Sequence, residues 1–506
     1  MTTTSLLLLV VLVVCDALVS RAPLQQRITR LHSVKVAAPP PETIVVTKKK
    51  TSIAPLAQQQ QPPLALQRLA SLAEKTVWTE FGALAASLPD AKNLGQGYPD
   101  WSPPQFAVDA YREVAEGPSS THQYARSAGL PKLCEVLGRR YSTHFERPID
   151  AMREVAVCVG ATQALLVSLM SVIQKAGDKV VVLEPCFDLY FGQIRLAGGV
   201  PKACKLKYDE EKRDFSIDFD ALEKSLRGSR VLIVNSPQNP TGKVFSENDL
   251  RRIAILVAQE NSERRKRNLG EDELIVISDE VYKYIVLDND EANHVHFAKF
   301  PGVQNNTLTV SSAGKTFSAT GWQIGWLVGP THLVAHAHRI LPYLQFCAST
   351  PMQAALAVAL DEAEKPYLGF PTYYAWLREE YARKRQILKD GLLAANLKPL
   401  RATGGFFLLA DVQDYLDVIP AKYFEPSPAK AAPVTPDWAF SRWIAHDFGV
   451  VAIPASPFFS TSSDSLRFED DVDLSDRLVR FAFCKADAVL HEAADRLRSL
   501  PHPSTK

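Results

Sequence analysis

The sequence lacks the features of three broad protein classes. Its 57 Lys and Arg residues nearly equal its 56 Asp and Glu residues, and this formal charge of +1 argues against a nucleic-acid binder. Beyond the first 20 residues no apolar run approaches the ~20 residues of a membrane-spanning helix, so we expect no stable membrane association. The seven cysteines include no pair with CxxC spacing, so neither a metal site nor a redox pair is predicted. The remaining composition, 46% hydrophobic and 22% charged, is typical of a globular protein.

The start of the chain has the composition of a targeting leader. The apolar stretch SLLLLVVLVV, Ser5 to Val14, is too short to span a bilayer and suits the apolar region of a signal peptide. The first 50 residues hold seven Lys or Arg and two acidic residues, and Pro- and Gln-rich sequence follows. We therefore expect residues 1–65 to be a targeting leader and a disordered segment. A signal followed by a transit peptide favours a plastid, with the mitochondrion and the secretory lumen as alternatives.

Short apolar runs alternate with helical stretches between about Glu154 and Val310. The runs are EVAVCVG, KVVVLEP, RVLIVNSP, ELIVISDE and TLTVSS. Each is nearly uninterrupted, as expected of strands that are buried on both faces of a parallel sheet. The alternation predicts an α/β domain with three layers around a mostly parallel sheet.

The pattern changes after about residue 351. A charged helical stretch from Tyr374 to Leu393 precedes the runs GGFFLLADV, GVVAIPASPFF and LVRFAFC, which predict a second, smaller α+β domain. Four prolines between Glu425 and Trp438 predict an exposed loop there. We expect an N-terminal arm and part of the small domain at 66–107, the large domain at 108–357 and the small C-terminal domain at 358–500.

Polar residues follow each predicted strand of the large sheet. The segments after successive runs are Gly160-Ala161-Thr162, Glu184–Phe187, Asn235–Gly242, Asp279–Tyr282 and Ser311–Lys315. Ligands of open α/β sheets bind beyond the carboxyl ends of the strands, so we expect these groups on one rim. A lone lysine such as Lys315 is more often a solvated surface residue. Together, however, an anion site, an aromatic ring, an amide, a carboxylate, a phenol and an amine match the needs of pyridoxal 5′-phosphate.

The chemistry of this cofactor explains the residue types. A desolvated lysine holds its aldehyde as a Schiff base, and a carboxylate keeps its ring nitrogen protonated so that the ring withdraws electrons. Amides and hydroxyls at a helix start hold its phosphate. The small Ser, Ala and Gly neighbours of Lys315 leave room for the aldehyde.

Five ordered motifs resemble the class I, fold-type I aminotransferases. They are NLGQGYPDWSPP (Asn93–Pro104), NSPQNPTGKVFS (Asn235–Ser246), ISDEVY (Ile277–Tyr282), SSAGKTFSATGWQIGW (Ser311–Trp326) and VRFAFCK (Val479–Lys485). The sequence is most similar to the group of kynurenine aminotransferase, also known as glutamine transaminase K and cysteine-S-conjugate β-lyase. The resemblance implies transfer of the amino group of an L-amino acid (kynurenine, glutamine, methionine or an aromatic type) to a 2-oxo acid. β-Elimination from cysteine S-conjugates, giving pyruvate and ammonia, is the alternative.

The resemblance also implies a role for each matching residue. Lys315 would hold the cofactor and move a proton, Asp279 would face the ring nitrogen, and Tyr282 would complete the catalytic set. The other cofactor-binding residues implied are Asn239 and Tyr282 at the ring hydroxyl, Phe187 on the ring, and Ala161, Thr162, Ser312 and Gln323 at the phosphate. Tyr124 would reach the phosphate of a neighbouring subunit, which implies a homodimer with shared active sites.

For the substrate, the resemblance implies that Arg480 pairs with the α-carboxylate, with Asn239 and the backbone of Gly97 beside it and Trp78 bordering the side-chain pocket. Gln323 departs from the family, which usually has Lys or Arg eight residues after the lysine. Since glutamine brings no charge to a phosphate, we expect weaker retention of the cofactor.

Overall fold

The computed structural model describes residue 72 and residues 75–267, 272–288, 294–460 and 474–501. The predicted leader, residues 1–65, lies outside the described residues, so its role and its destination stay predictions. No helix of the described segments combines the length and apolarity needed to cross a membrane.

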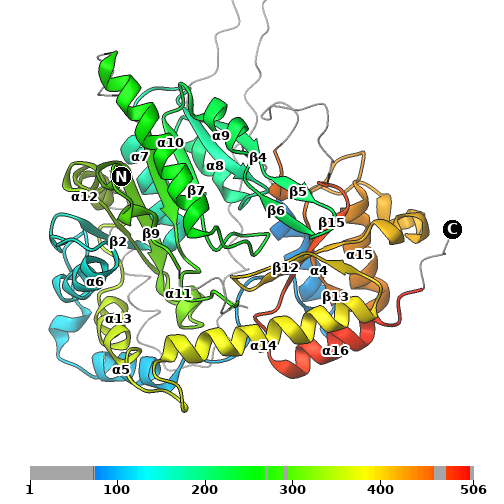
Figure 1. Ribbon diagram of the computed structural model, residues 1–506. Helices are drawn as coiled ribbons and strands as arrows, with labels where there is room; N and C mark the ends of the chain where they lie inside the picture. Colours follow the sequence, from blue (N-terminus) through cyan, green and yellow to red (C-terminus); the bar gives the residue numbers. More distant parts are fainter. Residues whose placement is uncertain (1–71, 73–74, 268–271, 289–293, 461–473, 502–506) are drawn as a thin grey trace, which may run out of the picture. The chain divides into compact units, whose positions relative to one another are not determined.

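A seven-stranded sheet forms the centre of the large domain (Figure 1). Its strands are β2 (Val155–Val159), β3 (Lys179–Glu184), β4 (Val200–Lys205), β7 (Val231–Asn235), β8 (Ile275–Asp279), β9 (Thr307–Ser312) and β10 (Ile324–Val328), in the order β2-β10-β9-β8-β7-β3-β4. β10 pairs antiparallel with both of its neighbours, and the other pairs are parallel. The predicted α/β class with a mostly parallel sheet is confirmed.

Helices cover both faces of this sheet, because alternate residues of each buried strand point to opposite sides. On β7, Val231 and Ile233 pack with helices α7, α8 and α12, whereas Leu232 and Val234 pack with α9 and α10. The helices are α5 (Gln105–Ala115), α6 (Pro131–His144), α7 (Gly160–Val172), α8 (Leu189–Leu196), α9 (Phe219–Leu226), α10 (Glu247–Lys266), α11 (Ala313–Thr316), α12 (Thr331–Leu344) and α13 (Thr350–Glu362). The large domain therefore has three layers, with helices on either side of the sheet, as predicted.

A four-stranded antiparallel sheet forms the second, smaller domain. Its strands, in spatial order, are β11 (Lys398–Pro399), β12 (Phe407–Asp411), β15 (Leu478–Ala482) and β14 (Ile453–Pro454). Its helices are α14 (Tyr373–Ala394), α15 (Pro436–Phe448) and α16 (Asp487–Leu497), and α14 and α16 run side by side in Figure 1. The short hairpin of β5 (Lys207–Asp209) and β6 (Asp214–Ser216) lies outside both sheets.

The N-terminal arm joins the small domain through a strand pair. β1 (Lys92–Asn93) pairs in parallel with β13 (Val450–Val451), while α4 (Val77–Ser87) precedes it in the chain. The expected assignment of residues 66–107 and the other predicted domain boundaries stay predictions.

The structure differs from the sequence-based expectation at the start of α15. The loop predicted for Glu425–Trp438 ends earlier, because Pro436 occupies the first turn of the helix and Thr435 precedes it in an extended conformation. Proline is well tolerated in that position, where its missing N–H has no partner to lose. Trp438 is therefore a buried helical residue rather than part of an exposed loop.

Candidate active site

One cavity of about 340 Å³ collects nearly all of the predicted site residues at the carboxyl edge of the large sheet. The predicted residues that line it are Trp78, Gly97, Ala161, Thr162, Phe187, Asn239, Asp279, Tyr282, Ser312, Lys315, Gln323 and Arg480. Tyr124 is the exception: its side chain is 80% exposed and its ring packs edge-on against Phe346. The carboxyl rim of the large sheet supplies most of these residues, whereas Trp78 of α4, Gly97 of the arm and Arg480 of β15 enter from outside that sheet.

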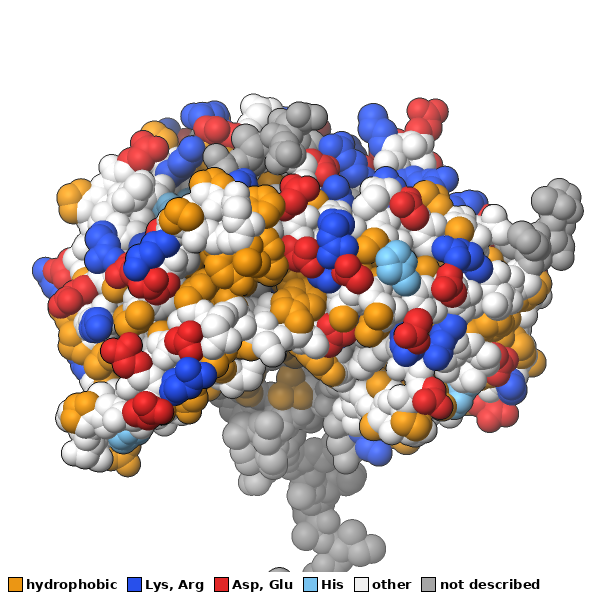
Figure 2. Space-filling model, turned by 90° about the horizontal axis from the view of Figure 1, so that it is seen from below, with side chains coloured by type: hydrophobic (Ala, Val, Ile, Leu, Met, Phe, Trp, Pro, Cys, Tyr) orange, Lys and Arg blue, Asp and Glu red, His pale blue; other side chains and the backbone are white. Residues whose placement is uncertain are grey.

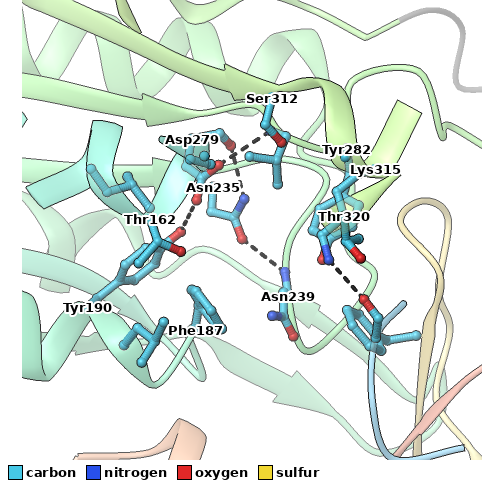
Figure 3. Close-up of a pocket in the computed structure, with 18 of the residues that line it drawn as sticks. Thr162, Phe187, Tyr190, Asn235, Asn239, Asp279, Tyr282, Ser312, Lys315 and Thr320 are labelled. Carbon is cyan, nitrogen blue, oxygen red and sulfur yellow. Dashed lines mark hydrogen bonds between the residues drawn. The ribbon is translucent and has the colours of Figure 1, made fainter. Parts of the chain in front are cut away.

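Lys315 lies in the one-turn helix α11 that follows β9 directly (Figure 3). Its amine donates a hydrogen bond of 2.8 Å to the carbonyl oxygen of Gly97, and it lies 5.2 Å from the ring centre of Phe406. Burial lowers the pKa of this amine to about 8. A substantial fraction is thus neutral near physiological pH, which is the form that attacks an aldehyde.

Asp279 ends β8 and is fully buried at the back of the cavity. Burial raises the pKa of its carboxyl to about 6, against the lowering effect of a 2.6 Å hydrogen bond donated by the Tyr190 hydroxyl. The backbone N–H of Val281 donates a further bond of 3.3 Å. A buried carboxylate held in this way favours a cationic partner, such as a protonated ring nitrogen.

Two asparagines connect the ends of β7 and β8. The amide nitrogen of Asn235 donates to the backbone oxygen of Asp279 over 2.9 Å, and its side-chain oxygen accepts from the backbone N–H of Asn239 over 2.9 Å (Figure 3). Asn235 therefore fixes the turn that carries Asn239. The hydroxyl-bearing ring of Tyr282 lies in the same wall, buried, with the Lys315 amine 5.9 Å from its centre.

The start of α7 forms an anion cradle on the other side of the cavity. Gly160 adopts a φ of +72°, and the following Ala161 and Thr162 open the helix, whose first N–H groups have no partners within the helix. A side chain at Gly325 would come within 2.3 Å of the Gly160 backbone, so glycine is needed there for β10 to approach. Such a helix start binds phosphate groups readily.

Gln323 borders this cradle but contributes no charge to it. Its amide nitrogen donates to the backbone oxygen of Thr320 over 2.6 Å, and its backbone is left-handed, with a φ of +51°. Among the described residues that line the cavity, the cationic side chains are Lys315 and Arg480.

Arg480 lies on β15 of the small domain, and 1% of its surface is exposed. Its guanidinium donates to the side-chain oxygen of Asn239 over 2.9 Å and to the backbone oxygen of Gly95 over 3.0 Å, while its buried Nε has no partner. It also stacks over the ring of Phe407 at 4.0 Å. No carboxylate of the described residues lies within ion-pair distance, so this buried cation suits an anionic ligand.

Trp78 enters the cavity wall from α4. Its indole N–H donates to Asp188 over 2.7 Å, and the Arg480 guanidinium lies 5.0 Å from its ring centre. Burial raises the pKa of the Asp188 carboxyl, and one of its oxygens has no partner. The end of the cavity beside Arg480 is therefore bounded by the indole ring of Trp78, which the Asp188 carboxylate orients.

Sequence reasoning missed four residues of the site: Tyr190, Asn235, Asp188 and Thr320. Two of them stand within motifs quoted above, since Asn235 opens NSPQNPTGKVFS and Thr320 belongs to SSAGKTFSATGWQIGW, whereas Asp188 and Tyr190 lie one and three residues beyond Phe187. Their contacts depend on strand order and on pairings about 90–110 residues apart, which no local motif contains. Thr320 accepts the amide of Gln323 through its backbone oxygen, a contact that has no residue-type signal.

Comparisons with known proteins agree with this geometry. Residues 89–476 match the family described as aminotransferase class I and II. The chain is 34% identical to the kynurenine–oxoglutarate transaminase of Dictyostelium discoideum, over 84% of this chain and 94% of that protein, and 33% identical to kynurenine–oxoglutarate transaminase 1 of Homo sapiens, over 83% and 94%.

Solved structures show the same fold. An N-succinyldiaminopimelate aminotransferase from Mycobacterium tuberculosis superposes with a TM-score of 0.72 at 32% identity, covering 86% of this chain and 99% of the other. A protein of Escherichia coli with a methionine aminotransferase function gives a TM-score of 0.70 at 30% identity, covering 88% and 100%. The resemblance and the fold predicted from the motifs are confirmed: the chain is an enzyme of the class I and II aminotransferase family.

Proposed function

We propose that the enzyme uses pyridoxal 5′-phosphate to move the amino group of L-kynurenine, or of glutamine, methionine or an aromatic amino acid, to a 2-oxo acid. The observation that carries this proposal is the meeting of half-buried Lys315 with buried Asp279 and buried Arg480 in one cavity. The names of the kynurenine–oxoglutarate transaminases to which the chain is similar support the donor and acceptor.

The described residues fit this cofactor. Lys315 supplies an amine, and burial lowers the pKa of this amine to about 8. Asp279 supplies a buried carboxylate that can accept a further hydrogen bond from a protonated ring nitrogen. The opening of α7, with Ser312 opposite it, offers N–H groups and hydroxyls to a phosphate. When bound, the cofactor withdraws electrons from the substrate carbon that carries the amino group.

The residues of the chain then have separate tasks. Arg480 holds the substrate carboxylate by two parallel hydrogen bonds, and Asn239 orients the guanidinium. This contact fixes the substrate Cα toward Lys315, whose amine removes the proton from that carbon. Trp78, oriented by Asp188, excludes water from the side-chain pocket and favours flat donor side chains.

A panel of amino donors tests the proposal. The purified enzyme, saturated with cofactor, is incubated with L-kynurenine, L-glutamine, L-methionine or L-phenylalanine and 2-oxoglutarate, and glutamate is measured together with the new 2-oxo acid. We expect equal amounts of both products with at least one donor and none when 2-oxoglutarate is omitted. Failure of every donor with several 2-oxo acids would contradict the proposal.

β-Elimination stays a prediction without an observation of its own. The same panel includes a cysteine S-conjugate, for which pyruvate and ammonia formed without a 2-oxo acid would identify the lyase reaction. An exclusive lyase would give these products and no amino transfer.

Gln323 gives rise to a prediction about cofactor retention. Replacing it by lysine adds a charged donor beside the cradle, and a charge-assisted hydrogen bond contributes roughly 1.5–3 kcal/mol. We therefore expect Gln323→Lys to lower the dissociation constant for pyridoxal phosphate by about 10- to 100-fold, measured by equilibrium dialysis of the cofactor. Gln323→Met, whose side chain is equally long and uncharged, is the control and should not bind the cofactor more tightly than the wild type. An unchanged dissociation constant for Gln323→Lys would contradict the predicted role of charge at this position.

A homodimer with shared sites is also part of this proposal. It is supported by aromatic side chains that stand exposed on a single chain, Tyr124 at 80%, Tyr343 at 90% and Phe346 at 58%. Figure 2 shows apolar side chains gathered near the middle of one face, with charges of both signs around them. Exposed apolar groups of this kind are typical of surfaces that bind another protein.

A further inference from the structure

A second cluster of ionisable side chains lies behind the catalytic carboxylate. Glu280 follows Asp279 at the end of β8, but it does not line the catalytic cavity; it is 1% exposed and contacts His294 and His296 instead. The two adjacent carboxylates therefore belong to separate sites. The second site has no role in amino transfer as proposed above.

Glu280 contacts two imidazoles through one oxygen, while its other oxygen accepts from the Ser278 hydroxyl and the Phe297 backbone N–H. Its Oε2 lies 2.5 Å from Nδ1 of His296 and 3.0 Å from Nε2 of His294. Among the described residues, no lysine or arginine lies within ion-pair distance of this carboxylate. The ammonium of Lys283 instead donates to the hydroxyl of Tyr141 over 3.0 Å and lies over the same ring. Burial of a carboxylate without a lysine or arginine partner is costly, and a bound cation would offset that cost.

The directions of the imidazole nitrogens are informative. Although His294 Nε2 is 3.0 Å from Glu280, neither of its buried ring nitrogens makes a hydrogen bond of good geometry. The ring of His144 stacks on that of His296 with the centres 4.4 Å apart, and its buried Nε2 has no partner either. Ligands of one ion direct their lone pairs at the ion rather than at each other, which leaves close contacts of this kind.

We propose that Glu280, His294 and His296 bind one Zn²⁺ ion. Two imidazoles and a carboxylate form a donor set that Zn²⁺ uses widely. The three ligand atoms lie within 4.8 Å of one another. A tetrahedral ion with bonds of about 2.1 Å separates its ligands by about 3.4 Å, so small side-chain movements are enough.

A cavity of about 420 Å³ opens beside these ligands. His144, His294 and His296 line it, together with Lys283 and Glu146. It gives the ion a route to the site and leaves its fourth position to water. The cysteines take no part, so the site is consistent with the absence of CxxC spacing in the sequence.

Metal content tests this proposal without any measurement of amino transfer. Untagged enzyme saturated with cofactor is treated with a chelator, titrated with ZnSO₄, separated from free metal by gel filtration and analysed by atomic emission. We expect one Zn²⁺ per chain, and a rise in unfolding temperature that saturates at the same ratio. The absorption of the bound cofactor should stay unchanged, because the ion binds outside the catalytic cavity. A wild-type enzyme that retains no zinc, or whose zinc alters the cofactor spectrum, would overturn the proposal.

Variants locate the ion. His296→Gln and His294→Gln should each weaken Zn²⁺ binding. Loss of a residue that only hydrogen-bonds a metal ligand lowers metal affinity by about 10- to 100-fold, so loss of a ligand itself should lower it at least as much. The matched control is His332→Gln, which removes an exposed histidine of α12 and should bind as the wild type does. Equal losses in all three variants would indicate nonspecific surface binding and reject the site.

The wild-type enzyme alone decides the matter if the variants fail to fold. Co²⁺ replaces Zn²⁺ in sites of this type and has visible absorption that reports tetrahedral or five-coordinate nitrogen and oxygen ligation. We expect one equivalent of Co²⁺ to develop this absorption and one equivalent of Zn²⁺ to abolish it. Co²⁺ that shows only the pale spectrum of the hydrated ion would reject the site.

Discussion

Replacing Lys315 by alanine should lower the rate of amino transfer by about 10⁴-fold while leaving the fold intact. The variant loses the group that holds the cofactor covalently and the group that moves the proton of the substrate, and proton transfer alone accounts for about 10²- to 10⁴-fold. Stability should change little, because the buried amine has no carboxylate partner that would be left uncompensated. Its polar contact is one hydrogen bond to the Gly97 carbonyl, beside the rings of Tyr282 and Phe406.

Two measurements separate these losses. Initial rates with the best donor give the catalytic effect, and mass spectrometry after borohydride reduction shows whether the cofactor is fixed to residue 315. Lys315→Arg keeps a positive charge but stays protonated, so it should be as inactive as the alanine variant. The exposed Lys389→Ala is the matched control and should be as active as the wild type. Full activity of Lys315→Ala would refute the proposed mechanism.

Replacing Arg480 by leucine should lower kcat/KM by about 10²- to 10⁴-fold, because two hydrogen bonds to a charged carboxylate contribute roughly 1.5–3 kcal/mol each. Arg480 is buried among the rings of Trp78, Phe407 and Phe458, so leucine is tolerated there better than a polar residue. Arg480→Lys should recover only part of the loss, since an ammonium cannot form the paired contact.

A substrate that lacks the carboxylate provides the control. The decarboxylated amine of the best donor should react slowly with the wild type, and the Arg480→Leu variant should be no slower with it. If the variant lost equal factors with the amino acid and with the amine, Arg480 would act on the fold rather than on the carboxylate. Thermal unfolding of both proteins checks this second reading.

The rim of the large sheet was predictable because it follows from strand type alone. Once the runs after residue 154 are identified as parallel strands, Asp279 and Lys315 must lie at the same edge, whichever strand stands between them. The structure places both residues in one cavity. The order of the strands was not predictable, since it depends on crossovers: β10 inserts antiparallel between β2 and β9.

Contacts across that order were equally inaccessible to sequence reasoning. The Tyr190 hydroxyl reaches Asp279 from α8, which follows β3, although β7 lies between β3 and β8 in the sheet. Asp188 contacts Trp78, which belongs to the arm 110 residues earlier in the chain. Neither pair has a local signal, because each depends on how the helices and the arm pack. The predicted role of Tyr124 stays a prediction, since it concerns a second copy of the chain.

The guanidinium of Arg480 has a consequence for shortened forms of the protein. It unites β15 with Gly95 from the arm and Asn239 from the large sheet, so three segments encoded far apart complete a single contact. A chain that ends before β15 would retain Lys315 and Asp279 but would lack this guanidinium, and it would also lose the strand that pairs with β12 and β14 in the small sheet.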